Sequence, residues 1–201
     1  MLTSNIKFKN FNITKIKKIK NFKKEMWFKK IKLLESLKTS YKYSYSKKQI
    51  QKISKDKNFR LIGMGGSSLG AEAIYQFLNY KVKKKFIFIN NLNSKIKDEE
   101  KKIKATNIII SKSGNTLETI ANSNLLIKGN KNIFITENKK SQLSNLANIL
   151  KAEIIEHKNY IGGRYSVLSE VGMLPAEVMG LNERKFKRFN YLINNNNFLN
   201  E

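Results

Sequence analysis

Apolar positions along the chain follow two different patterns, and the change comes near residue 60. Before that point no segment has a strand pattern, and the apolar residues recur at helical spacing: Met26, Trp27, Ile31, Leu33, Leu34 and Leu37. A second short helix is expected over residues 49–53. We therefore predict that residues 1–58 form a helical arm packed on the domain that comes after it.

In residues 59–181, short apolar runs alternate with longer segments of helical pattern. The runs predict strands at residues 61–62, 86–89, 107–110, 133–135 and 153–155. The segments between and after them predict helices at residues 67–80, 94–102, 116–127, 143–150 and 165–179. Short strands without polar alternation, joined by helices, favour a parallel sheet covered on both faces, which is a three-layer αβα sandwich. Residues 182–201 contain an asparagine run and predict a polar, flexible tail.

The chain has 201 residues, no cysteine and one histidine. This composition excludes a disulfide framework, a thiol nucleophile and a thiolate or histidine-rich metal site. We interpret His157 as a surface residue after a strand rather than as a general acid or base. The apolar runs are too short to span a membrane, and no apolar stretch follows the lysine-rich N-terminus. We therefore expect a cytoplasmic protein with no membrane partner.

The formal net charge is +25, which raises the question of a nucleic-acid partner. Only four of the basic residues are arginines, although bidentate base contacts favour arginine. The lysines are scattered and accompany abundant asparagine and isoleucine, a composition typical of AT-rich coding sequence. A nucleic-acid-binding protein remains an alternative, disfavoured here, that predicts binding with a steep salt dependence. The positive field would also attract a phosphorylated substrate.

Residues 63–70, GMGGSSLG, join the first predicted strand to a helix. Glycines let a backbone approach a ligand closely, and a helix start offers free N–H groups to an anion. Ser67 can cap the helix and also offer a hydroxyl group. A tight turn without any ligand explains the segment equally well, and its glycine spacing is not that of a dinucleotide site.

Residues 111–119, SKSGNTLET, join another strand to a helix. Hydroxyl groups, a lysine and a glycine turn at a helix N-terminus are the donors that a phosphate group requires. The site would lie at the carboxyl end of the parallel strands, where open α/β sheets bind ligands. A capping box is the alternative, but it explains neither Lys112 nor the second serine.

Residues 162–166, GGRYS, place one of the four arginines after two glycines. The guanidinium group of Arg164 can bind an anionic oxygen through its planar fork. An exposed loop arginine without a ligand is the alternative.

In this order, the three segments resemble the phosphoglucose isomerase family. The pattern GxGGSxLG resembles the family's first sugar-phosphate loop, and SKSGxTxET resembles its phosphate loop, which other sugar isomerase (SIS) domains share more loosely. The pattern GGRYS, with NYI before it and VLS after it, resembles the family's own signature. The resemblance covers residues 60 to about 180 and implies a SIS-like fold for residues 59–181, although Glu170 departs from the small residue usual there.

The resemblance implies interconversion of glucose 6-phosphate and fructose 6-phosphate through an enediolate, without cofactor or metal. Gly66 and Ser67 would line the sugar. Arg164 would stabilise the enediolate, and Glu118 would orient a histidine that opens the sugar ring. The residues that would hold the phosphate are Ser111, Lys112, Ser113 and Thr116.

In the family, the general base, the ring-opening histidine and a lysine belong to the second half, beyond the positions that this chain covers. We therefore expect a partial chain that binds hexose 6-phosphate, as a homodimer or with a missing second half, and does not isomerise it alone. A different SIS-type isomerase is one alternative, which GGRYS disfavours. A SIS-domain regulator that binds sugar phosphate without catalysis is another.

Overall fold

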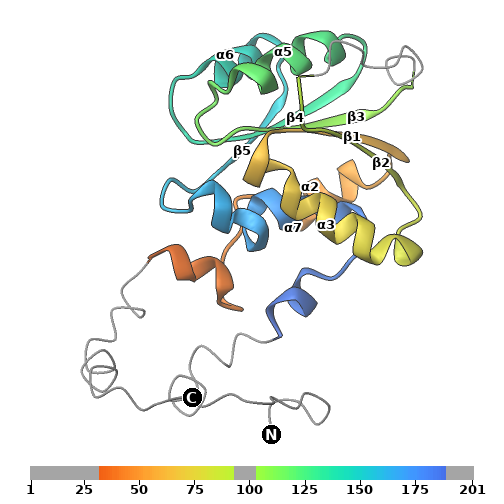
Figure 1. The fold of residues 1–201 in the computed structure, drawn as a ribbon, viewed down its shortest axis with the longest axis vertical. Helices are drawn as coiled ribbons and strands as arrows, with labels where there is room; N and C mark the ends of the chain where they lie inside the picture. Colours follow the sequence, from red (N-terminus) through yellow and green to blue (C-terminus); the bar gives the residue numbers. More distant parts are fainter. Residues whose placement is uncertain (1–31, 93–102, 189–201) are drawn as a thin grey trace, which may run out of the picture.

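The computed structural model describes residues 32–92 and 103–188, which contain one parallel sheet in the order β2-β1-β3-β4-β5 (Figure 1). Each neighbouring pair of strands runs parallel, so the predicted parallel sheet is confirmed. The strands are β1 (Asn58–Ile62), β2 (Lys85–Ile89), β3 (Thr106–Ile110), β4 (Lys131–Thr136) and β5 (Glu153–Glu156).

Helices cover both faces of this sheet, which confirms the three-layer αβα sandwich (Figure 1). One face carries α5 (Leu117–Leu126) and α6 (Gln142–Ile149). The other face carries α2 (Lys47–Ile53), α3 (Leu69–Leu78), which continues into a short 3₁₀ turn η4 (Asn79–Lys81), and α7 (Glu170–Val178).

The central strand β3 shows why its sequence lacks polar alternation. All of its residues are buried. Ile108 and Ile110 pack in the core beneath α3 and α7, whereas Ile109 packs in the core beneath α5 and α6. Because successive strand side chains point to opposite faces, a strand covered on both faces must be apolar at every position.

A row of polar residues, buried at Arg60 and Asn107, crosses the sheet beneath α5. Arg60, Asn107 and Asn132 are register neighbours on β1, β3 and β4. Arg60 Nη1 donates to Asn107 Oδ1 at 3.3 Å, and Asn107 Nδ2 donates to Asn132 Oδ1 at 2.8 Å. The two asparagines also donate to the carbonyl groups of Leu126 and Ile127, where α5 ends. The row therefore satisfies helix-end carbonyl groups that have no partner within the helix.

The described part of the N-terminal segment packs against α7 and the core. The predicted helix at 49–53 is confirmed as α2, whose start is fixed by a capping box between Ser46 and Gln49. Ile50 and Ile53 are buried. Of the earlier predicted helix, residues 32–37 form a 3₁₀ helix, η2 (Lys32–Leu37), and residues 26–31 lie outside the described residues. The predicted helix at 94–102 also lies outside them.

The prediction of one continuous helix over residues 165–179 is wrong. Residues Gly163–Leu168 form a 3₁₀ helix, η5, and α7 begins only after Ser169, whose hydroxyl oxygen accepts from Val171 N. The two pieces pack closely, because a Cβ atom on Gly172 would lie 2.0 Å from the carbonyl oxygen of Val167. Within the predicted tail, Glu183–Lys187 form a further 3₁₀ helix, η6, and residues 189–201 lie outside the described residues.

Candidate functional site

The first two candidate segments follow β1 and β3, which are neighbours in the sheet, and the third follows β5. After β1 the chain forms β2, which pairs with one edge of β1. It then forms β3, which pairs with the other edge of β1, and β4 extends the sheet from there. The carboxyl ends of β1 and β3 therefore form the topological switch point of the sheet, where open α/β folds bind ligands. Two turns meet there, residues 63–68 after β1 and residues 111–116 after β3.

The glycine turn after β1 lies close to the end of β3. A Cβ atom on Gly63 would lie 2.9 Å from the carbonyl oxygen of Ile110, and Gly65 has a positive φ of 54°. The turn includes a 3₁₀ helix, η3 (Gly65–Ser67). The predicted capping role of Ser67 is wrong, because Ser68 is the residue before α3, and its side chain makes no capping hydrogen bond.

The serine turn after β3 groups three hydroxyl oxygens. Ser111 Oγ lies 2.8 Å from Thr116 Oγ1 and 3.5 Å from Ser113 Oγ. Gly114 has a positive φ of 68°, and its N–H donates to Ser111 Oγ at 3.2 Å. Thr116 is the N-cap residue of α5, yet its side chain makes no capping hydrogen bond. The capping-box alternative therefore does not explain these hydroxyl groups.

Lys112 extends from the serine turn toward the loop that precedes GGRYS. Its Nζ donates to the carbonyl oxygen of Asn159 at 2.8 Å and lies 3.5 Å from Glu137 Oε1. Glu137 follows β4 and also pairs with Lys139. Burial raises the pKa of Glu137, but the ammonium groups of Lys139 and Lys112 outweigh it and hold that pKa below its usual range.

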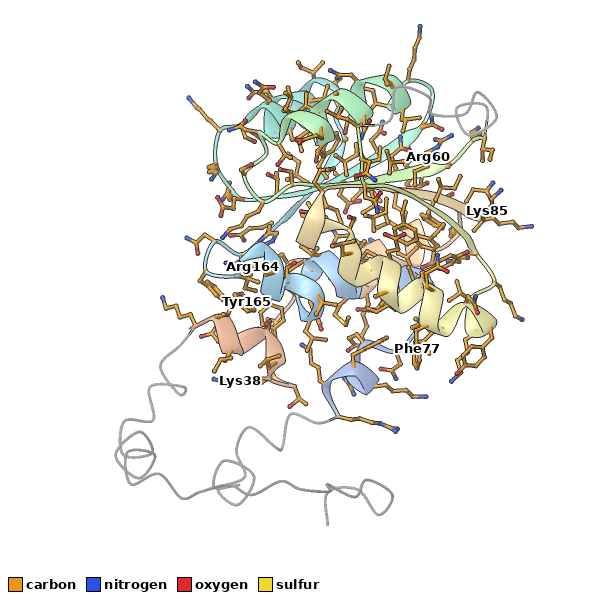
Figure 2. The ribbon with its side chains drawn as sticks, viewed as in Figure 1. Lys38, Arg60, Phe77, Lys85, Arg164 and Tyr165 are labelled. Atoms are coloured by element: carbon orange, nitrogen blue, oxygen red, sulfur yellow. The ribbon has the colours of Figure 1, made fainter. Side chains whose placement is uncertain are left out.

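The arginine loop, residues 162–166, contacts the glycine turn directly. A Cβ atom on Gly66 would lie 2.1 Å from the carbonyl oxygen of Gly163. Ser166 Oγ donates to the carbonyl oxygens of Gly66 and Gly163, at 3.2 Å and 2.7 Å. Figure 2 shows Arg164 on η5 beside the sheet, and the side chain is exposed, with no hydrogen bond or ion pair to any other described residue. The three segments therefore meet in the fold, and the guanidinium group is open to a ligand.

Glu118 lies in the first turn of α5 and is partly exposed. No hydrogen bond or ion pair joins it to another residue of the described chain. The first turn of α5 directly follows the serine turn, but the Glu118 carboxylate has no partner among the described residues.

His157 is not the surface residue that the sequence predicts. It is 1% exposed. Its backbone N–H donates to the carbonyl oxygen of Thr136 at 2.8 Å, and its ring Nδ1 lies 3.1 Å from the carbonyl oxygen of Lys158. Burial lowers the pKa of His157, against the raising effects of the Lys158 carbonyl group and Glu170. The side chain is therefore part of the packing beneath the loop that leads to Arg164.

The sequence analysis assigned no role to Glu137, Asn159 or Ser166, although the patterns NYI and GGRYS contain the last two. Glu137 directly follows β4, so the rule that parallel strands end at one edge could have placed it near the serine turn. Asn159 accepts the hydrogen bond from Lys112 with its backbone carbonyl group, and a pattern of side chains does not reveal such a contact.

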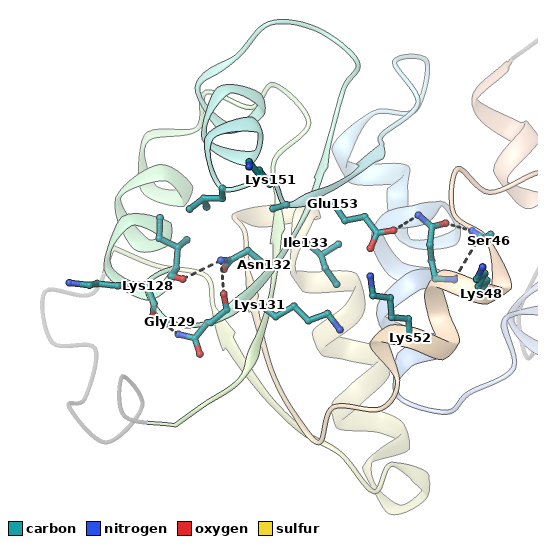
Figure 3. A pocket seen from close by; sticks show the side chains of 15 residues that line it. Ser46, Lys48, Lys52, Lys128, Gly129, Lys131, Asn132, Ile133, Lys151 and Glu153 are labelled. Atoms are coloured by element: carbon teal, nitrogen blue, oxygen red, sulfur yellow. Dashed lines mark hydrogen bonds between the residues drawn. The ribbon is translucent and has the colours of Figure 1, made fainter.

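A hollow lies away from these turns, at the amino ends of β4 and β5 (Figure 3). It has a volume of about 810 Å³, and its lining includes Lys48, Lys52, Lys128, Lys131 and Lys151. Because lysine is spread over the whole chain, this lining alone indicates no ligand. Among the residues that the structure describes, no helix could cross a bilayer, and no group of three His, Cys, Asp or Glu residues could hold a metal ion.

A family model described as phosphoglucose isomerase matches residues 14–198. A glucose-6-phosphate isomerase of Borreliella afzelii is 38% identical over 140 residues, which cover 60% of this chain and 26% of that protein. The enzyme of the same name from Acholeplasma laidlawii is 34% identical over 169 residues, which cover 71% of this chain and 40% of that protein. The chain thus spans well under half the length of these relatives.

Solved structures agree on the fold. A hypothetical protein from Thermus thermophilus superposes with a TM-score of 0.70 at 19% identity, over 88% of this chain and 47% of that one. Tagatose-6-phosphate ketose/aldose isomerase from Escherichia coli superposes with a TM-score of 0.54 at 14% identity, over 84% of this chain and 48% of that one.

Proposed function

Since the chain belongs to the phosphoglucose isomerase family, we propose that its three convergent turns bind a hexose 6-phosphate for isomerisation between glucose 6-phosphate and fructose 6-phosphate. The observation that carries this proposal is the meeting of the serine turn and the arginine loop at the switch point of the sheet. One end of this edge presents hydroxyl groups to a phosphate, and the other presents an exposed guanidinium group.

The phosphate end is the serine turn. The hydroxyl groups of Ser113 and Thr116 each lie within hydrogen-bond range of Ser111 Oγ, at the N-terminus of α5. Free N–H groups and the helix dipole favour an anion there. Lys112 lies beside it, with its ammonium group paired to Glu137. Because the phosphate is remote from the carbons that react, its binding energy positions the sugar for the reaction.

The sugar end lies beside the contact between the glycine turn and η5. Gly66 and Ser67 line the sugar in this proposal, and Arg164 faces C1 and C2. Isomerisation removes a proton from one of these carbons, forms an enediolate and returns a proton to the other. The guanidinium group stabilises the negative charge that develops on the enediolate oxygen, which lowers the barrier.

Proton transfer needs a general base, and ring opening needs an acid–base group that Glu118 orients. His157 is buried under its own loop and is not a candidate for that group. We propose that both groups come from the portion of the family that this chain does not match, which a second half would supply. The chain alone then binds substrate without turning it over.

A coupled isomerase assay on the purified chain, run beside thermal unfolding with glucose 6-phosphate or unphosphorylated glucose, tests the proposal. We expect stabilisation by glucose 6-phosphate alone, and turnover only after the missing half is added. Turnover by the chain alone would place the base within these residues. No stabilisation at millimolar glucose 6-phosphate would reject the binding site. Stabilisation that stays without turnover when the second half of a relative is added would favour the regulator alternative.

A further inference from the structure

Lys112 joins two of the candidate turns through its side chain. We propose that Lys112 is a positioning residue, whose ammonium group holds the loop before Gly162 and thereby sets the separation between the serine turn and Arg164. This inference rests on the proposed function and adds to it, because it names a determinant of ligand length. It assigns Lys112 a role that differs from direct contact with the phosphate group.

The ammonium group is already engaged. It donates to the Asn159 carbonyl group at 2.8 Å and lies 3.5 Å from Glu137 Oε1. The side chain of Glu137 is only 13% exposed, so this pair is better shielded from solvent than a surface ion pair. An ammonium group with two acceptors in place has little freedom to turn toward the hydroxyl groups of the serine turn.

The backbone of Lys112 is also held by hydrogen bonds. Its carbonyl oxygen accepts from Glu137 N at 3.2 Å and from Thr136 Oγ1 at 3.4 Å. Both donors lie at the end of β4, which is hydrogen-bonded to β3. Lys112 therefore links the strand ends to the loop, which is also attached to the end of β4 by the hydrogen bond from His157 N to the Thr136 carbonyl oxygen.

The loop passes this restraint on to Arg164 through consecutive turns. Ile161 N donates to the Lys158 carbonyl group at 3.1 Å, and Tyr165 N donates to the Gly162 carbonyl group at 2.9 Å. Beyond Arg164, η5 is held by the hydrogen bond from Ser166 to Gly66. Arg164 thus lies between two attachments, one to the β1 turn and one, through Lys112, to the β3 turn.

This arrangement makes Lys112 matter for some ligands more than for others. Inorganic phosphate occupies only the serine turn and does not depend on where Arg164 lies. A ligand with anionic groups at both ends, such as 6-phosphogluconate with its C1 carboxylate, needs both ends at the correct separation. Loss of Lys112 should therefore weaken 6-phosphogluconate binding more than inorganic phosphate binding.

The experiment compares Lys112→Met with Lys139→Met by calorimetry with both ligands. Lys139 pairs with the same glutamate but makes no hydrogen bond to Asn159, so its variant controls for lost charge. We expect Lys112→Met to weaken 6-phosphogluconate binding about tenfold and phosphate binding less than about twofold. The variant loses the charged hydrogen bond to the Asn159 carbonyl group, which affects the position of Arg164 but not the serine turn. Lys139→Met should change both affinities alike and slightly, and Lys112→Arg should restore part of the loss.

Hydrogen exchange gives a readout that needs no ligand. In Lys112→Met, the amides of Ile161 and Tyr165 should exchange faster, whereas that of Gly114 should not change. Glu137→Gln, which keeps the side-chain volume, should show the same pattern more weakly and serves if Lys112→Met fails to fold. Equal losses for both ligands, or unchanged exchange at Ile161 and Tyr165, would overturn the positioning role. If the wild-type chain binds neither ligand, the proposed function fails, and the exchange measurement still tests the contact by itself.

Discussion

Gly66 is the residue at which two of the candidate turns touch. A Cβ atom built on it would lie 2.1 Å from the Gly163 carbonyl oxygen and 3.1 Å from the Arg164 N atom. These neighbours are backbone atoms, so they cannot move aside as a flexible side chain can. Glycine is therefore required at this position because the β1 turn and the arginine loop are in close contact there.

We predict that Gly66→Ala destabilises the chain by about 2 kcal/mol, because overpacking forces backbone shifts. The variant should also weaken 6-phosphogluconate binding, since Arg164 moves with its loop. Gly163→Ala is the matched control, because a Cβ atom there meets nothing within 4 Å. Urea unfolding followed by circular dichroism measures the difference. Equal stability of the two variants would contradict the close approach.

Among the elements, the start of α7 depends on a segment far away in sequence. Glu170 is 0% exposed, and its carboxylate accepts from Tyr41 Oη at 2.9 Å and from Ser44 N at 3.0 Å. It also accepts from the hydroxyl group of Ser44. The departure from a small residue at this position is thus matched by polar partners in the N-terminal segment, and together they hold the helix that comes after η5.

We predict that Glu170→Ala costs about 2 kcal/mol of unfolding free energy, because Tyr41 and Ser44 lose their buried acceptor. Glu156→Ala is the control, since its pair with Lys158 lies at the surface and should contribute little. A double-mutant cycle with Tyr41→Phe should give a coupling of about 1 kcal/mol between Glu170 and Tyr41. Additive effects in that cycle would show that the hydrogen bond contributes nothing.

Some of the elements could be predicted from the sequence, and others could not. Apolar runs such as residues 107–110 identify buried strands, and parallel topology brings the turns after β1 and β3 to one edge, so the meeting of the first two segments was predictable. The division of residues 163–178 into η5 and α7 was not, because it depends on close packing at Gly172 and on a cap at Ser169. The burial of His157 and Glu170 depends on distant partners, which a single sequence does not display.

At the scale of the whole molecule, the lysines that give the net charge of +25 include a buried one, Lys187. Lys187 is 5% exposed, and its Nζ lies 4.8 Å and 4.6 Å from the ring centres of Tyr41 and Tyr43. Burial lowers the pKa of Lys187 to about 8, against the raising effects of Glu183 and Glu170. Burial, assisted by Glu170, raises the pKa of Tyr41.

We predict that the free energy of unfolding rises between pH 8 and about pH 10 and falls above it. In the lower range the unfolded chain, with an ordinary lysine pKa of 10.5, binds a proton that folded Lys187 has lost, so stability rises with pH. Above pH 10, the unfolded tyrosines lose protons that folded Tyr41 keeps, so stability falls. Urea unfolding across this range measures both limbs, and Lys187→Met should flatten the rise. A rise that persists in the variant would assign it to another group.

The most direct test of the binding site is calorimetric titration of glucose 6-phosphate into the wild-type chain and two matched valine variants of α5. Thr116→Val removes a hydroxyl group of the serine turn that caps no helix N–H. Thr119→Val, one turn further along, removes a buried hydroxyl group that has no hydrogen-bond partner in the described chain. We predict that Thr116→Val weakens binding by about tenfold or more, since a hydrogen bond to a charged group is lost, and that Thr119→Val leaves it unchanged. Binding that is equal in the wild-type chain and Thr116→Val, or absent from the wild-type chain, would contradict a phosphate site at the serine turn.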